Sequence, residues 1–209
     1  QPTILDFDMQ RISQRINIVF NIRTEGNIKR EDLAAPIIEL SGACGRFNIA
    51  DACLDPPRLY RMVHQAQPDE FTQTGENTYR CVVHFHTLGV IPSAAKGHLN
   101  GPGILQVALQ VSANRLDASG APVLDQDGKP VKNSRYIYGA INPYDELTAA
   151  QLIEVRDGKT YLRYSKDDVN IEITSPLVIK ADQIVSDDTG MGWQPNDPTN
   201  PDDDIIIEI

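Results

Sequence analysis

The sequence lacks the features that mark several large classes of protein. Its 209 residues carry 19 basic and 29 acidic side chains, which gives a net charge of −10. Nucleic-acid binders need a basic face for the phosphate backbone, so this balance argues against that class and against electrostatic adhesion to anionic lipid. No stretch approaches the ~20 consecutive apolar residues of a membrane helix.

Cysteine is scarce, with only Cys44, Cys53 and Cys81 in the chain. No two of them form a C-x-x-C pair, which argues against zinc sites and thioredoxin-like chemistry. An odd count leaves at least one thiol free or paired between chains, and Cys44 and Cys53 could bridge if the chain turns between them. We favour the interpretation that all three are small buried side chains.

Catalytic and cofactor signatures are also missing. The sequence has no G-x-S-x-G elbow, no P-loop and no dinucleotide fingerprint. Asp125-x-Asp127-Gly128 resembles the start of a calcium loop, but Lys129 and Tyr136 stand where an EF-hand needs its next ligands. Turns at residues 118–120 and 126–129 are the favoured interpretation. We therefore expect no enzymatic activity, no catalytic residues and no cofactor.

Two histidines form the pattern H-x-H at His84 and His86. Alternation places both imidazoles on the same face of a strand, which is how some metal sites begin. Sequence spacing does not fix His64 or His98 nearby as a third ligand. A solvated outer face that carries two histidines is therefore favoured over a metal centre.

What the sequence does contain is alternation of apolar and polar residues with a period of two, which is typical of half-buried strands. Shorter candidate strands cover residues 36–42, 58–65, 134–141, 160–165 and 204–209. The clearest inward-facing sets are Ile16, Ile18, Phe20 and Ile22; Tyr79, Cys81, Val83 and Phe85; Leu105, Val107, Leu109 and Val111; and Val169, Ile171 and Ile173.

Many short strands separated by turn residues predict an all-β fold, a Greek-key β-sandwich in one domain over residues 1–209. Helix is limited to residues 142–155, with Asn142 as cap and Pro143 in the first turn, and to one further turn in residues 28–35. Residues 187–204 predict a long loop that leads to a terminal strand. No internal repeat with a fixed period is evident.

The order of these segments resembles the fimbrillin-type proteins of Bacteroidetes and their lipoprotein relatives. The similarity rests on "IIELSGACGRFNIADA", "RCVVHFHTLGVIP", "GPGILQVALQVS", "AINPYDELTAAQ" and "GMGWQPNDPTNPDDDIIIEI". It implies a transthyretin-like β-sandwich, exported and lipid-anchored before assembly at the cell surface. The start at Gln1, without a methionine, is expected of a processed or trimmed chain whose leader or anchor is missing.

In that family, subunits join when a terminal strand of one fills the open groove of the next. The segment "DIIIEI" is suited to this role, because Ile205, Ile207 and Ile209 fill one face, and Ile206 and Glu208 the other. Two interpretations stay open: the strand pairs within its own sandwich, or it is donated to a neighbour. Donation predicts a fimbrial subunit or adhesin whose partners are other subunits or surface ligands.

A second function from another class is a surface glycan-binding module of a polysaccharide-uptake system. Sugar-binding sheets expose aromatic side chains, and the candidates here lie in the second half of the chain. They are Tyr136, Tyr138, Tyr161, Tyr164 and Trp193.

Overall fold

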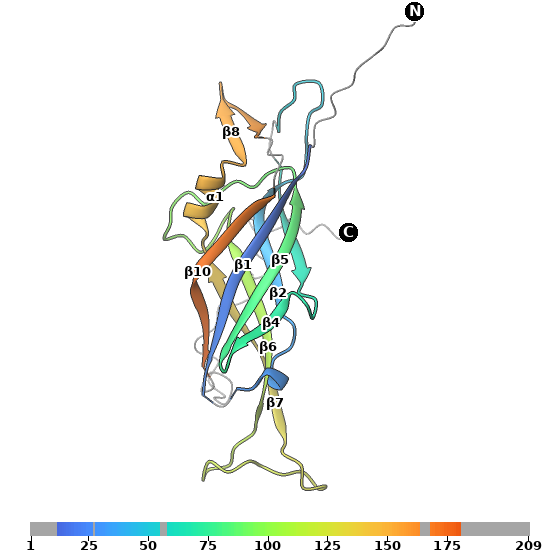
Figure 1. Cartoon of the computed structure of the whole chain (residues 1–209), viewed down its shortest axis with the longest axis vertical. Coiled ribbons are helices and arrows are strands. Elements are labelled where there is room, and N and C mark those ends of the chain that lie inside the picture. Colours follow the sequence, from blue (N-terminus) through green and yellow to red (C-terminus); the bar gives the residue numbers. More distant parts are fainter. Residues whose placement is uncertain (1–11, 27, 55–57, 164–167, 181–209) are drawn as a thin grey trace, which may run out of the picture.

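The structure, a computed structural model, describes residues 12–26, 28–54, 58–163 and 168–180. These residues form two four-stranded sheets, a separate two-stranded hairpin and one short α-helix (Figure 1). The predicted all-β sandwich is confirmed. The predicted loop at residues 187–204 and the terminal strand with Ile205, Ile206, Ile207 and Ile209 lie outside the described residues.

The first sheet has the strand order β10-β1-β5-β4. Its members are β1 (Gln14–Glu25), β4 (Phe71–Gly75), β5 (Thr78–Thr87) and β10 (Val169–Lys180). β1 pairs antiparallel with β5 along nearly its whole length and parallel with β10. A parallel pair needs a long crossover, and here the rest of the fold lies between the two strands in the sequence.

The second sheet has the order β3-β2-β6-β7. Its members are β2 (Ile37–Cys44), β3 (Leu59–Gln65), β6 (Leu105–Asn114) and β7 (Lys132–Ile141). All four lie where alternation predicts strands, and their pairings with one another are antiparallel. The chain therefore forms hairpins in one sheet and then crosses to the other.

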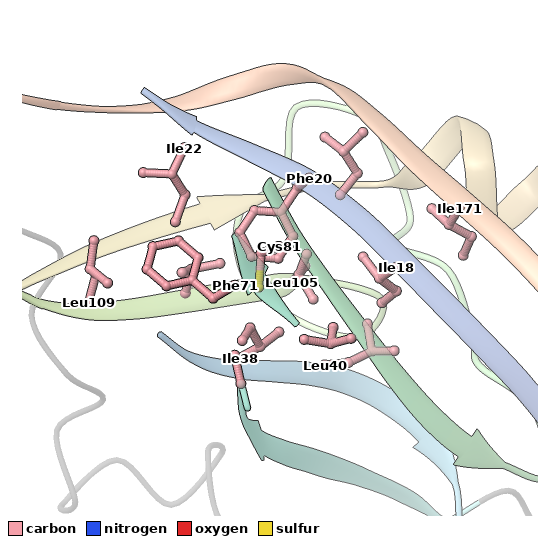
Figure 2. Close-up of a cluster of buried hydrophobic side chains, with 14 of the residues drawn as sticks. Ile18, Phe20, Ile22, Ile38, Leu40, Phe71, Cys81, Leu105, Leu109 and Ile171 are labelled. Carbon is pink, nitrogen blue, oxygen red and sulfur yellow. The ribbon is translucent and has the colours of Figure 1, made fainter. Parts of the chain in front are cut away.

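The core lies between the two sheets and is built from the inward faces that alternation predicts. The side chains of Ile16, Ile18, Phe20 and Ile22 are 0% exposed. Figure 2 shows Phe20 and Ile18 of β1 opposite residues of the second sheet such as Leu105 and Leu40. Burial of these side chains removes apolar surface from water, which is the main force that holds the two layers together.

The three cysteines are buried free thiols, as the favoured interpretation predicts. Burial raises the pKa of the Cys44 thiol to about 11. Burial and, secondarily, the charge of Glu70 raise the pKa of Cys81 to about 12. Both thiols are therefore protonated at neutral pH and behave as small apolar side chains.

One flank of the sandwich is closed where β10 meets β7. A Cβ atom on Gly139 would lie 2.2 Å from Cδ1 of Leu177, so the missing side chain of Gly139 leaves room for Leu177. Leu177 packs against the core cluster from this position. The two sheets are thus joined at this flank by a side chain that fits into a notch in the partner strand.

The predicted helix is shorter than the pattern suggests. α1 (Tyr144–Ala150) ends at Gln151, which adopts a left-handed φ of 48°. The predicted cap is wrong: Pro143 occupies the N-cap, and the amide of Asn142 instead donates hydrogen bonds to the carbonyls of Ala95, Lys96 and His98. The further turn predicted in residues 28–35 is confirmed as the 3-10 turn η1 (Arg30–Asp32).

The end of the predicted helix, residues 153–155, is instead strand. β8 (Ile153–Arg156) pairs antiparallel with β9 (Lys159–Leu162). Asp157 and Gly158 join the two strands with positive φ of 52° and 75°, as a two-residue hairpin turn requires. This local turn, together with the β-branched residues of β8, outweighs the helical periodicity.

The connection between β6 and β7 projects beyond the sandwich (Figure 1) and contains a tandem repeat. Residues 116–123 read LDASGAPV, and residues 124–131 read LDQDGKPV. In each unit, the aspartate carboxylate accepts two backbone N–H groups, at 2.8 and 2.9 Å for Asp117 and 2.9 and 2.8 Å for Asp125. The expectation that no repeat exists is therefore wrong, because a period of eight residues is hidden by the variable turn positions.

The two predicted turns are confirmed, with Gly120 at φ 82° and Gly128 at φ 76°. Three backbone hydrogen bonds connect the two units with each other and with Arg115, the residue that follows β6. Arg115 N–H donates to Val131 O at 2.7 Å, Val131 N–H to Val123 O at 2.8 Å, and Val123 N–H to Arg115 O at 2.8 Å. Each unit is therefore a self-contained turn that ends in a valine of equivalent position.

Deletion of one complete unit, residues 124–131, is expected to change the free energy of unfolding by no more than about 0.5 kcal/mol. Val123 would take the place of Val131, and it would then exchange both backbone hydrogen bonds with Arg115 in an ordinary antiparallel pair. Thermal unfolding of the shortened chain measures the effect. Deletion of only residues 124–127 is the control. It breaks a unit and shifts the backbone pairing between Arg115 and the valines, so it should destabilise the β6–β7 connection. Equal losses from both deletions would show that the units are not self-contained.

Candidate functional site

The flank opposite the β7–β10 contact is open. β4 pairs with β5 only between Thr78 and Cys81. One further bond follows, from Val82 N–H to Glu70 O at 2.8 Å. From Val83 to Thr87, no strand in the described part of the chain pairs with this edge of β5. β3, at the edge of the second sheet, likewise pairs only with β2 among the described strands.

Backbone alternation identifies which groups point out of these edges. Val82 N–H points away from β1, so the backbone groups of His84 and His86 point the same way. On the other sheet, Ala66 N–H donates to Pro36 O, so the backbone groups of Val63 point outward from β3. Both edges therefore offer strand-type donors and acceptors to an added strand.

Between these edges lies a groove of about 730 Å³. The inward side chains of β3 are only partly buried, whereas those of β1 are fully buried. Val63, beside them, is 64% exposed. The apolar and aromatic side chains that line the groove are Ala43, Cys44, Tyr60, Met62, Val63, Phe85 and Leu88.

Gly45 shapes one end of the groove. A Cβ atom at this position would lie 1.8 Å from Cε2 of the Tyr60 ring, so the ring lies across the glycine. The backbone of Gly45 also donates to Arg58 O at 3.1 Å, which continues the pairing of the two strands past the end of β2. The groove therefore has an aromatic wall that depends on a missing side chain.

Apart from Cys44 and Tyr60, the titratable residues of the groove lining are basic. Arg61 and His64 come from β3, and His84 and His86 from β5. His64, His84 and His86 are three of the four histidines in the chain. Among the lining residues that the structure describes there is no carboxylate, although the whole chain has a net charge of −10.

The nearest carboxylates are held by partners of their own. Glu70 lies 2.7 Å from His64 Nε2 and accepts the N–H of Gln67 at 2.8 Å. Burial acts to raise the pKa of Glu70, but the hydrogen bonds from Gln67 and His64 outweigh it and hold that pKa below its usual value. Glu39 pairs with Arg61 at 3.2 Å, and burial raises the pKa of Glu39 against that pairing.

His84 and His86 lie on the same outer face of β5, as the sequence predicts. His84 Nδ1 is 2.7 Å from Asn17 Oδ1, and the Asn17 amide donates to Asn170 Oδ1 at 2.8 Å. The three residues form a polar ladder across β5, β1 and β10. No three potential metal ligands converge anywhere in the described part of the chain, so the structure supplies no third ligand to the H-x-H pair.

The three candidate sugar-binding tyrosines that the structure describes lie on two separate elements. Tyr136 and Tyr138 stack on β7 with ring centroids 6.2 Å apart, and Tyr136 is 52% exposed. Tyr161 lies on the separate hairpin under the Arg156 guanidinium, 4.5 Å from its carbon to the ring centroid. Tyr164 and Trp193 lie outside the described residues.

Comparison with family models, with curated proteins and with solved structures found no match to this chain. In the described residues, no helix is long and apolar enough to cross a bilayer. Function must therefore be argued from the fold and the groove. Sequence reasoning missed the groove. A local signal does exist in "RLYRMVHQ", because its apolar alternation is weaker than that of the central strands.

Proposed function

We propose that this protein is a non-enzymatic structural or adhesin subunit of a cell-surface assembly, of the fimbrial kind. It accepts a β-strand in the open flank between β3 and β5. Membrane attachment, in this proposal, comes only through a lipid anchor. The proposal joins the resemblance to fimbrillin-type proteins with a sandwich that has a closed flank and an open one.

The observation that carries the proposal is the groove between two strand edges that have no neighbouring strand in the described part of the chain. There the outward backbone groups of β5 beyond Val82 pair with no described strand, and the apolar side chains of Met62 and Phe85 line the space beside them. An added strand would satisfy the backbone groups and bury alternate side chains against this lining. Catalysis does not require strand edges beside an apolar groove, whereas strand capture does.

The segment proposed to fill the groove is residues 204–209 of a neighbouring copy, with its run of isoleucines. A strand rises about 3.3 Å per residue, so this six-residue segment is long enough to cover the five residues of β5, Val83 to Thr87, that no described strand pairs. An own-sandwich pairing of the same segment would use the same chemistry, but it would not produce multimers. Self-association therefore separates the two interpretations.

Deletion of residues 203–209 is expected to abolish self-association and to leave the thermal midpoint of the remaining sandwich nearly unchanged. The deleted chain keeps its acceptor groove, so it should also cap and shorten multimers of the intact chain. Sedimentation velocity of each chain alone and of their mixture measures both effects. A deleted chain that multimerises as the intact chain does would overturn the proposal. A large loss of thermal midpoint without loss of multimers would show that the strand belongs to its own sheet.

A further inference from the structure

We infer that the captured strand always binds with the same face toward the groove and that pH controls its capture. Ile205, Ile207 and Ile209 enter the groove, while Asp204 and Glu208 lie on the outer face beside His84 and His86. Capture then strengthens as the two histidines take up protons. This inference rests on the proposed strand capture and specifies its partner surface and its regulation.

The faces follow from the period of two in both strands. On β5, Phe85 points into the sandwich and is 4% exposed, whereas His84 and His86 point to the outer face. A strand paired with this edge places one set of alternate side chains inward and the other outward. The apolar lining selects the face of the partner that has only isoleucine, which is Ile205, Ile207 and Ile209.

The opposite face of the same segment then meets the histidines. It carries Asp204, Ile206 and Glu208. Residues directly opposite on neighbouring strands have Cβ atoms roughly 5 Å apart, and diagonal neighbours are within reach of longer side chains. If Ile206 lies opposite one histidine, a carboxylate lies opposite the other and the second carboxylate lies on the diagonal.

The charged groups already around these histidines are engaged with partners of their own. His84 bonds Asn17, and its charge also acts on Glu70, which His64 already engages. Arg15 is the β1 neighbour of His86 and is paired with Asp168 at 3.6 Å. Arg61 of β3 is paired with Glu39. Glu70, Asp168 and Glu39 thus each have a partner of their own, and an incoming carboxylate would be an additional partner for His84 and His86.

The sign of the pH effect follows from the two residue classes. Histidines as a class gain charge between pH 8 and 5, whereas exposed aspartate and glutamate stay ionised above roughly pH 5. Ion pairs between histidine and carboxylate therefore form as the pH falls from 7.5 to 5.5. Cross-strand charge pairs of this kind contribute enough to tighten binding roughly three- to tenfold for two pairs.

A fluorescently labelled peptide of residues 202–209, titrated with the full chain, tests the inference at pH 7.5 and 5.5. The peptide is expected to bind the intact chain roughly three- to tenfold more tightly at pH 5.5. The double variant H84Q/H86Q should bind equally at both pH values, because glutamine can still donate to Asn17 but gains no charge. H98Q is the matched control, since His98 is exposed and lies outside the groove, and it should keep the full pH effect.

A second peptide with Asp204→Asn and Glu208→Gln should bind without pH dependence. If H84Q/H86Q keeps the pH effect, or if the intact peptide binds equally at both pH values, the pH inference fails while strand capture stands. If the intact peptide does not bind at either pH, the proposed function fails as well. Thermal unfolding of each variant confirms that the comparison is between folded chains.

Discussion

Replacement of Phe20 with alanine is expected to lower the free energy of unfolding by about 3–5 kcal/mol. Phe20 is 0% exposed and lies in the middle of β1, which is paired on both sides. Figure 2 shows its ring among side chains of both sheets, including Cys81 and Leu105. Loss of the ring leaves a cavity between the two layers, and the strands around it are held in register by their own backbone hydrogen bonds, so the site can collapse only partly. Urea denaturation of the variant measures the change.

Val19→Ala is the matched control for this prediction. Val19 is the neighbour of Phe20 on the same strand but points to the outer face, where it is only partly buried. Its truncation should cost about 1 kcal/mol or less. Similar losses at the two positions would mean that the two layers do not meet at Phe20 and that the alternation has been misread.

The inward face of β1 is the part of this fold that the sequence predicts best. A period of two is a local property, and it requires only that one face of the strand be buried. The same argument correctly predicts the faces of β5, β6 and the first half of β10. It does not predict that β1 pairs in parallel with β10, because no local pattern records which distant strand becomes the neighbour.

The errors in the sequence analysis have local physical causes. β4 was not predicted because its sequence, FTQTG, has a single apolar side chain, and only Phe71 is buried. The predicted helix runs too far because the hairpin turn at Asp157 and Gly158 determines the structure of the residues before it. In each case a turn or a tertiary pairing outweighs the intrinsic preference of a short segment.

The histidine pair shows how much of the candidate site the sequence can predict. Its placement on one outer face follows from alternation, and the structure confirms it. Its position beside a groove does not follow, because the groove exists only where β5 extends past the start of β4 and where β3 has no outer neighbour among the described strands. A site of this kind depends on which strand edges have no neighbouring strand, and local sequence does not predict how distant strands pair.

The two flanks of the sandwich explain why strand capture would occur at one place. At the β7–β10 flank, Leu177 fills the notch above Gly139 and joins the layers. At the β3–β5 flank, Tyr60 and Met62 remain only partly covered. A strand that enters the second flank buries apolar surface that is already gathered there, whereas entry at the first would first have to displace Leu177.

Substitution of Gly42 by alanine is expected to cost roughly 2–5 kcal/mol, or to prevent folding, because two penalties combine. Gly42 has a φ of 81°, which L side chains rarely adopt. An added Cβ would also lie 2.6 Å from the backbone N of Gly103 and 2.8 Å from Ile91 O. These are backbone atoms, and Gly103 N–H is held by its own hydrogen bond to Ser41 O at 3.0 Å, so they cannot move aside as a side chain could.

Gly42 also lies in the register shift of β2 between Leu40 and Ala43, where the strand stops pairing with β6 and turns toward Val90. Gly97→Ala is the matched control, because a Cβ there meets nothing within 4 Å, and it should be neutral or slightly stabilising. Thermal and urea unfolding of both variants measure the difference. If Gly42→Ala is as stable as the intact chain, β2 can form without its bulge. The end of β2 that carries Cys44 and Gly45 to the groove would then be set by something other than this close backbone contact.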